Sequence, residues 1–475
     1  MTFKSRVKSW FAQPRQAINS LLLLVFCAAW VRDFFYWFPK DAFGSSLNYW
    51  AYTDWLIDYS QGFIRRGLSG EITWRLVPAG TPPLPTVAAF SWILILLAAF
   101  GYARLLARSL KDFHPMTLFG LLFLPSLFFF YLHDHNAIAR KEILGYLSLL
   151  LHLLVIEKSF PLKKNAGLPA DNELRRYLRG LAPIAVLLLP AIILIHEGNF
   201  LLFVPLHAML TLSVMQLKSP RGWQKDLLRA GLPYLPAALV FLGVYLSGTP
   251  GYLTLLNICK RWLAAGALRE GTCMLPPDKL SGSTLPASLI PMQWPLARAV
   301  QITLMVIATN WAAWLAVLPL LGVSLWYLAR QAVYALLRAR SVETSVEAFD
   351  ASTAQAYTKL FFRRYFLIPL LAALPIFLSA YDYGRWFSVL CVNYALVAAS
   401  LNLPCREYAL FRKEHAHETA GAESLRHLDS RAVFYALSIV ICILALTLWL
   451  PHYCIFVCEI VRSPLVFFSH YYFVN

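Results

Sequence analysis

Charged residues are scarce in this chain. They make up 14% of its 475 residues, while 59% are hydrophobic and the mean hydropathy is +0.57. Soluble globular proteins carry about 25% charged residues, and a chain with so few polar groups has too little polar surface to fold in water. The composition therefore excludes a soluble enzyme, a disordered scaffold and a disulfide-stapled secreted module, and it predicts a polytopic membrane protein.

Several motifs are also absent. The sequence contains no P-loop, dinucleotide-binding fingerprint, HExxH or GxSxG, and no CxxC pair with metal-ligand spacing. These absences argue against an ATP-driven motor, a serine hydrolase, a zincin and a thiolate metallocentre, so we expect no cofactor and no resident metal. The net charge of +17 indicates basic loops and anionic lipid surfaces rather than nucleic acid. Membrane lipids are the expected partners.

Apolar runs of about 20 residues, the length that spans a bilayer, recur along the whole chain. We therefore predict an all-α fold with one transmembrane helical domain over residues 1–475. The predicted spans number about eleven: 18–38, 86–104, 115–132, 143–157, 181–195, 200–216, 231–247, 299–328, 365–380, 386–403 and 432–450. The run 299–328 fits one tilted helix or a helix plus a re-entrant piece.

Lysine and arginine alternate between the two sets of connecting segments. With the amino terminus in the cytoplasm, the inner segments hold 28 of these residues and the outer segments hold 14. Because positive charge accumulates on the cytoplasmic side, this bias predicts a cytoplasmic amino terminus and a periplasmic carboxyl terminus.

Three connections are long: 39–85 and 248–298 on the outer side, and 329–364 on the inner side. Within the second, residues 252–268 show apolar residues at helical spacing, typical of a helix that lies in the membrane interface. Cys259 and Cys273 share that connection and would form a disulfide if its compartment is oxidising.

Four polar clusters follow the ends of predicted spans, and all four fall on the outer side. They are 53–67 (TDWLIDYSQGFIRRG), 133–142 (HDHNAIARKE), 196–199 (HEGN) and 381–386 (YDYGRW). Stray ionisable groups at a membrane boundary are costly. Their one-sided clustering therefore predicts a functional site on that face.

The first cluster combines carboxylates with arginines. Asp54 and Asp58 would share one face of a helix, where they would act as a general base or simply cap a surface helix. Arg65 and Arg66 stand between glycines, a setting suited to binding a phosphate or an outer-leaflet headgroup.

The other three clusters suit an anionic, hydroxyl-rich substrate. His133 and His135 read either as metal ligands or as neutral interfacial imidazoles, and Arg140 and Lys141 favour an anion. In the third, the pair His196 and Glu197 would act as a proton acceptor or as a polar gate. In the fourth, Asp382, Arg385 and Trp386 form either a self-satisfied turn in the aromatic belt or a sugar-stacking and phosphate contact.

The pieces GFIRRGLSG, ARKE, HEGN and DYGRW, each at the outer end of an apolar run, resemble polytopic proteins of bacterial surface-polysaccharide synthesis. These include Wzy-type and EpsG-like polymerases, which belong with the multi-span lipid-sugar glycosyltransferases. The resemblance implies a bacterial inner-membrane enzyme that acts on polyprenyl-phosphate- or diphosphate-linked saccharides at the periplasmic face. It also implies other envelope-glycan assembly proteins as partners.

By that resemblance, arginines and an acid or histidine would carry the reaction. Arg65, Arg66, Arg140 and Arg385 would bind the phosphates, and Asp54, Asp58 or Glu197 would take the acceptor proton. The main alternative is a transporter or flippase for a lipid-linked or anionic solute, which is expected to carry ionisable groups deep in its spans. An accessory subunit without chemistry of its own is a third hypothesis.

Overall fold

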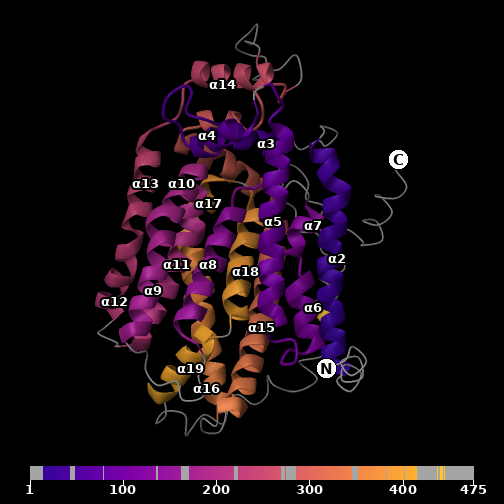
Figure 1. The fold of residues 1–475 in the computed structure, drawn as a ribbon, viewed down its shortest axis with the longest axis vertical. Coiled ribbons are helices and arrows are strands. Elements are labelled where there is room, and N and C mark those ends of the chain that lie inside the picture. Colours follow the sequence, from indigo (N-terminus) through magenta and orange to yellow (C-terminus); the bar gives the residue numbers. More distant parts are fainter. Residues whose placement is uncertain are drawn as a thin grey trace.

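The protein is an all-helical bundle (Figure 1). A computed structural model describes residues 14–42, 49–78, 80–134, 137–161, 171–218, 223–268, 273, 285–344, 351–380, 382–400, 402–414, 436, 439–441 and 443. Over these residues all regular structure is helical and no strand occurs. The predicted fold class is confirmed at this level.

All of the elements in the described residues are helices. In chain order they are α2 (Pro14–Ala42), α3 (Tyr49–Thr53), η1 (Asp54–Leu56), α4 (Gly67–Leu76), α5 (Leu84–Ala107), α6 (Pro115–Phe123), α7 (Phe129–His133), α8 (Ile143–Ser159), α9 (Asp171–Pro183), η3 (Ile184–Leu188), α10 (Leu189–Ile195), α11 (Gly198–Lys218), α12 (Trp223–Gly231), η4 (Leu232–Tyr234), α13 (Leu235–Leu246), α14 (Tyr252–Ala264), η5 (Ile290–Gln293), α15 (Leu296–Thr344), α16 (Ala351–Phe362), η6 (Arg363–Leu367), α17 (Ile368–Ser379), α18 (Tyr383–Ala399) and α19 (Asn402–Glu414).

Seven helices in the described residues are long and apolar enough to cross a membrane. They are Pro14–Ala42, Leu84–Ala107, Asp171–Ile195, Gly198–Leu217, Lys225–Leu246, Val317–Ala339 and Thr353–Ser379. The pair Tyr383–Ala399 and Leu403–Phe411, bent by 74°, makes an eighth if it is one span. The predicted span 115–132 is divided between α6 and α7, and 432–450 lies almost wholly outside the described residues.

The two ends of the bundle differ. In Figure 1, α3, α4 and α14 lie together at one end, with α14 across the bundle, while α12, α16 and α19 lie at the opposite end. The helix predicted over 252–268 is confirmed as α14, which buries Leu255, Cys259 and Trp262. The disulfide between Cys259 and Cys273 is present.

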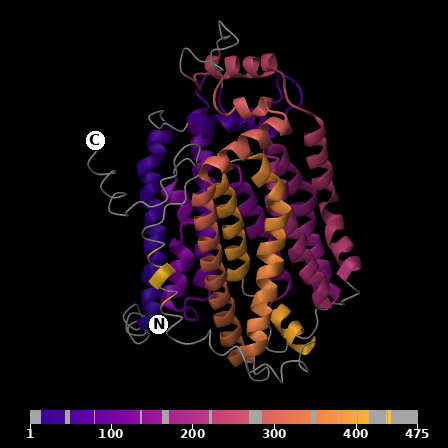
Figure 2. The same ribbon diagram turned by 180° about the vertical axis from the view of Figure 1, so that it is seen from behind.

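The segment around residue 329, which the sequence assigns to the start of a long inner connection, is helical. α15 runs unbroken for 49 residues (Figure 2). It is therefore one continuous helix. At about 1.5 Å per residue its path is about 70 Å long, more than twice the thickness of the hydrocarbon core of a bilayer.

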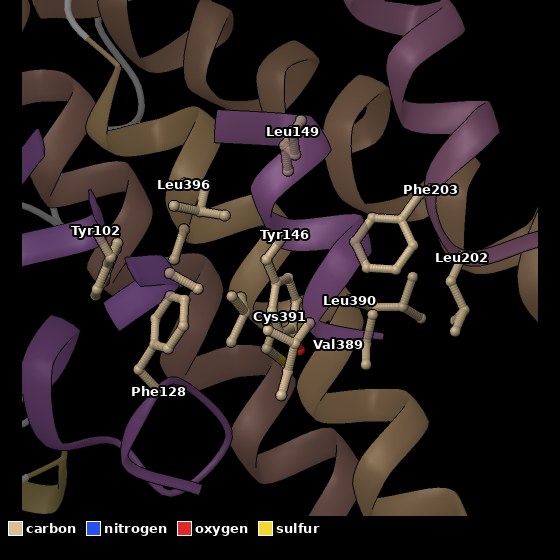
Figure 3. Close-up of a cluster of buried hydrophobic side chains, with 14 of the residues drawn as sticks. Tyr102, Phe128, Tyr146, Leu149, Leu202, Phe203, Val389, Leu390, Cys391 and Leu396 are labelled. Atoms are coloured by element: carbon tan, nitrogen blue, oxygen red, sulfur yellow. The ribbon is translucent and has the colours of Figure 1, made fainter. Parts of the chain in front are cut away.

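Large side chains fill the middle of the bundle around α18, all 17 residues of which are buried. Figure 3 shows this apolar layer, contributed mainly by α5, α8, α11 and α18: Tyr102, Phe128, Tyr146, Leu149, Leu202, Phe203, Val389, Leu390, Cys391 and Leu396. The Phe203 ring packs directly on Gly145, where an added Cβ would lie 2.2 Å from a ring carbon. Gly145 therefore permits close contact between α8 and α11.

We predict that Gly145→Ala lowers the free energy of unfolding by up to about 2 kcal/mol. Overpacking against the buried ring costs about 1–3 kcal/mol, and the gain in helix propensity offsets about 1 kcal/mol. Denaturant unfolding in detergent measures the change. Gly243→Ala in α13, with open space around its Cβ, is the matched control and is expected to be neutral or stabilising. Failure of Phe203→Leu to restore stability to Gly145→Ala would contradict the packing argument.

Candidate charge cluster

The four polar segments meet at the end of the bundle that carries α3 and α4. The first contact joins η1 to the segment before α8. Lys141 Nζ lies 3.1 Å from Asp54 Oδ2 and donates to the Asp54 backbone carbonyl at 2.8 Å. Lys141 is 1% exposed and Asp54 5% exposed, so each charge depends on the other for compensation.

Arg66 connects this pair to the turn between α10 and α11. Its guanidinium binds Glu197 in a bidentate manner, with Nε 3.0 Å from Oε2 and Nη2 2.9 Å from Oε1. Its Nη1 lies 3.5 Å from Asp54 Oδ1. Arg66 has φ 66°, a left-handed conformation that is uncommon for a residue with a Cβ. This backbone, at the N-cap of α4, directs the side chain into the cluster.

Arg65, the neighbour of Arg66, is held from two sides. Its Nη2 donates to the Pro291 carbonyl at 2.7 Å, and its Nη1 lies 3.9 Å from Glu197 Oε1. The segment 285–293 therefore closes one side of the site.

Glu142 joins the remaining segments. Its Oε1 lies 3.7 Å from His196 Nε2 and 3.9 Å from Arg385 Nη2. Arg385 Nη2 also contacts Asp382 Oδ2 at 2.7 Å, and the guanidinium lies 3.9 Å from the centre of the Trp386 ring. Glu142 has no exposed surface. We call the ten residues of this network the charge cluster: Asp54, Arg65, Arg66, Arg140, Lys141, Glu142, His196, Glu197, Asp382 and Arg385.

The tautomer of His196 follows from its backbone neighbour. His196 Nδ1 accepts a hydrogen bond from the Gly198 N–H at 3.2 Å. The neutral ring therefore carries its proton on Nε2, the atom that faces Glu142. Burial and the nearby Arg66 lower the pKa of His196 to about 4, so the ring is neutral at neutral pH.

The carboxylates of Asp54, Glu142 and Glu197 are ionised. Burial alone would raise the pKa of Asp54, but Lys141 and Arg66 outweigh it and hold that pKa well below its usual range. Glu197 is held low in the same way, chiefly by Arg66. Burial and Arg385 lower the pKa of Arg140 to about 9, which leaves it charged at neutral pH.

Several buried polar atoms of the site have no hydrogen-bond partner among the described residues. They include both carboxylate oxygens of Glu142, Nε and Nη1 of Arg385, both side-chain polar atoms of Asn199, Nε1 of Trp386, Nε of Arg65 and Oδ1 of Asp54. Such atoms are rare in folded proteins because each costs about 1–3 kcal/mol. Glu142, Arg385 and Asn199 therefore have the capacity to bind a polar group.

Some of the predicted site residues do not belong to the charge cluster. The expected shared helical face of Asp54 and Asp58 is absent, because η1 ends at Leu56 and Ile57 is extended. Asp58 instead binds Arg261 of α14 at 2.6 Å. The side chain of His133 and all of His135 lie outside the described residues.

Sequence reasoning missed two residues of the site, Glu142 and Asn199. Glu142 was assigned no role, and Asn199 reads as part of a turn. A signal was available, since Glu142 directly follows Lys141 and Asn199 comes two residues after Glu197, each at the start of an apolar run. Within the described residues, no group of three or more His, Cys, Asp or Glu side chains could hold a metal ion.

Comparison with models of known protein families, with curated proteins and with solved structures gave no match. We therefore infer the function from the geometry of the charge cluster.

We predict that the protein loses stability as the pH falls from about 6.5 to about 4. Over this range the unfolded chain binds a proton at His196 that the folded chain excludes, because the pKa of His196 falls from 6.5 to about 4 on folding. The effect amounts to about 3 kcal/mol across the window. Unfolding of wild type and His196→Asn at a series of pH values measures it. An equally steep pH dependence in His196→Asn would contradict the assignment.

Proposed function

We propose that the protein is a membrane glycosyltransferase or polysaccharide polymerase that acts on polyprenyl-phosphate- or diphosphate-linked saccharides. The observation that carries this proposal is the convergence of four segments, distant in sequence, into one cluster of buried acids and bases. Residues that only anchored the chain at the membrane surface would not need to contact one another. A site that must bind an anionic group and move a proton requires such a mixture.

We further propose that the chain lies in a bacterial inner membrane with about eleven spans, its amino terminus in the cytoplasm and its carboxyl terminus in the periplasm. The distribution of Lys and Arg supports this orientation. The disulfide between Cys259 and Cys273 supports it independently, because α14 lies at the same end as α3 and α4 (Figure 1) and disulfides persist in oxidising compartments such as the periplasm.

In the proposed complex, arginines bind the phosphate of the lipid-linked donor. Arg385 is the best suited, because its Nε and Nη1 have no partner among the described residues and a guanidinium binds phosphate oxygens in pairs. Arg65 offers its Nε from the opposite segment. Arg66 serves a positioning role, since Glu197 occupies two of its donors.

The proposed reaction is displacement at the anomeric carbon. The acceptor hydroxyl oxygen forms the new bond, and the bond between that carbon and the phosphate oxygen breaks, so the electron pair leaves with the polyprenyl (di)phosphate. Arg385 stabilises the charge that develops on this leaving group. Asp54, Asp58 and Glu197, the carboxylates expected from the sequence, each form an ion pair at 3.1 Å or less. Glu142 lies farther from its cationic neighbour, 3.9 Å from Arg385, and neither of its oxygens accepts a hydrogen bond from the described residues. We therefore assign it the acceptor proton.

We expect Glu142→Gln to lower the rate of glycosyl transfer by about 10²–10⁴-fold, the usual contribution of a general base. The change keeps the shape of the side chain and removes its charge. The assay uses purified protein in liposomes with polyprenyl-diphosphate oligosaccharides, and mass spectrometry detects elongated product and released polyprenyl diphosphate. Arg385→Lys is expected to raise KM through the loss of bidentate binding.

The matched control is Glu407→Gln. Glu407 is a buried carboxylate of α19, at the opposite end of the bundle, where it binds Arg364, Tyr357 and Tyr365. It is expected to lose stability and keep its turnover per folded molecule. The absence of transfer by the wild-type protein with both phosphate- and diphosphate-linked saccharides would contradict the proposed function.

A transporter or flippase is the second candidate, favoured by a buried polar network inside the helices. His152 Nδ1 lies 2.9 Å from His207 Nδ1, and the chain continues from His152 through Tyr177 and Thr211 to Tyr234. The apolar layer of Figure 3, however, lies on the same helices and includes Tyr146, Leu149 and Phe203. Substrate-dependent proton or ion flux in proteoliposomes would favour the transporter over the enzyme.

A further inference from the structure

A cavity of about 610 Å³ lies at the end of the bundle opposite the charge cluster. The cavity is lined by the first turn of α2, the connection between α5 and α6, the start of α6 and one face of α15. Its polar lining includes Arg15, Lys111, Asp112, His114, Tyr334 and Arg338. Three of these side chains are cations and one is an acid, so the cavity carries a net positive charge.

Backbone carbonyls fix the position of Arg15. Its Nε donates to the Phe113 carbonyl at 2.8 Å and its Nη2 to the Asp112 carbonyl at 3.1 Å. One turn later Asn19 donates to the Leu110 and Phe113 carbonyls at 2.6 and 2.9 Å. The start of α2 is therefore fastened to the connection before α6, and the guanidinium is held in place before any ligand arrives.

The other basic groups converge on Arg15 from different elements. Arg338 of α15 lines the same cavity as Arg15, together with Lys111 and Asp112 from the connection before α6. His114 caps α6 by accepting the Met116 N–H on Nδ1. Gathering like charges in one cavity costs free energy, and an anion with several oxygens would offset that cost by binding more than one cation.

The exposed surface next to the cavity is apolar. On α2, Ile18 and Val25 follow Arg15 at three and ten residues, on the same side of the helix, and each is 48% exposed. The helix itself qualifies as a membrane span, and only 17% of its apolar window is buried. A phosphate bound at Arg15 would thus have a hydrocarbon-facing helix surface directly beside it.

We propose that this cavity binds the phosphate of an anionic phospholipid, with Arg15, Lys111 and Arg338 on the phosphate and the acyl chains along the exposed face of α2. A soluble phosphate compound presents the same chemical group as the lipid, so it is the alternative ligand. The site is independent of the charge cluster and of the proposed transferase activity.

The test measures binding of phosphatidylglycerol, phosphatidylcholine and inorganic phosphate to the full-length protein in detergent, by native mass spectrometry. We expect the wild type to prefer phosphatidylglycerol to phosphatidylcholine. Arg15→Gln/Arg338→Gln is expected to weaken binding of phosphatidylglycerol by about tenfold or more, because charge-assisted hydrogen bonds are lost. Arg104→Gln removes an exposed cation from the last turn of α5, outside the cavity lining, and is expected to bind as the wild type does.

Equal affinity for the two lipids, with no binding of inorganic phosphate, would overturn the proposal. Binding of inorganic phosphate that the double variant loses, without a preference for phosphatidylglycerol, would assign the cavity to a soluble phosphate and reject the lipid. If the double variant does not fold, Lys111→Gln, in the connection before α6, takes its place. An unchanged affinity for phosphatidylglycerol in that variant would count against the site.

Discussion

A charge removed from water needs a partner, and this requirement organises the end of the bundle that carries α3 and α4. Lys141 is compensated by Asp54, and Glu197 by Arg66. Each pair joins segments that lie tens of residues apart or more. Because breaking a buried pair costs about 3–5 kcal/mol, the pairs fix how η1, α4, α8 and the turn before α11 sit relative to one another. The same ion pairs therefore compensate the buried charges and fix the arrangement of these segments.

Electrostatic balance distinguishes the two ends of the molecule. The charge cluster contains both acids and bases. At this end of the bundle Glu142, Arg385 and Asn199 keep buried polar atoms that have no hydrogen-bond partner among the described residues. At the cavity near Arg15, cations outnumber acids and backbone carbonyls do the positioning. The first arrangement suits chemistry, where charges must be fixed before reaction. The second suits retention of an anion.

The fold class, α14, its disulfide and most membrane helices could be predicted from the sequence, because hydropathy and helical spacing are local properties. The polar segments of the site were also visible, since charge is conspicuous beside apolar runs. The contacts between these segments were not visible in the sequence. Asp58 and Arg261 are 203 residues apart, and no local pattern specifies that contact. Glu142 stands beside Lys141 in sequence, yet their side chains have different partners, Asp54 for one and His196 for the other, which only tertiary packing decides.

The packing of Phe203 on Gly145 bears on proton transfer within the bundle. Together with Tyr146 and Leu149, this ring belongs to the buried layer of Figure 3, on the helices α8 and α11 that also carry the hydrogen-bonded imidazoles of His152 and His207. Protons hop only along connected donors and acceptors. The side chains of Phe203 and Leu149 offer neither a donor nor an acceptor, so they add no link to the hydrogen-bonded chain that starts at His152 and His207.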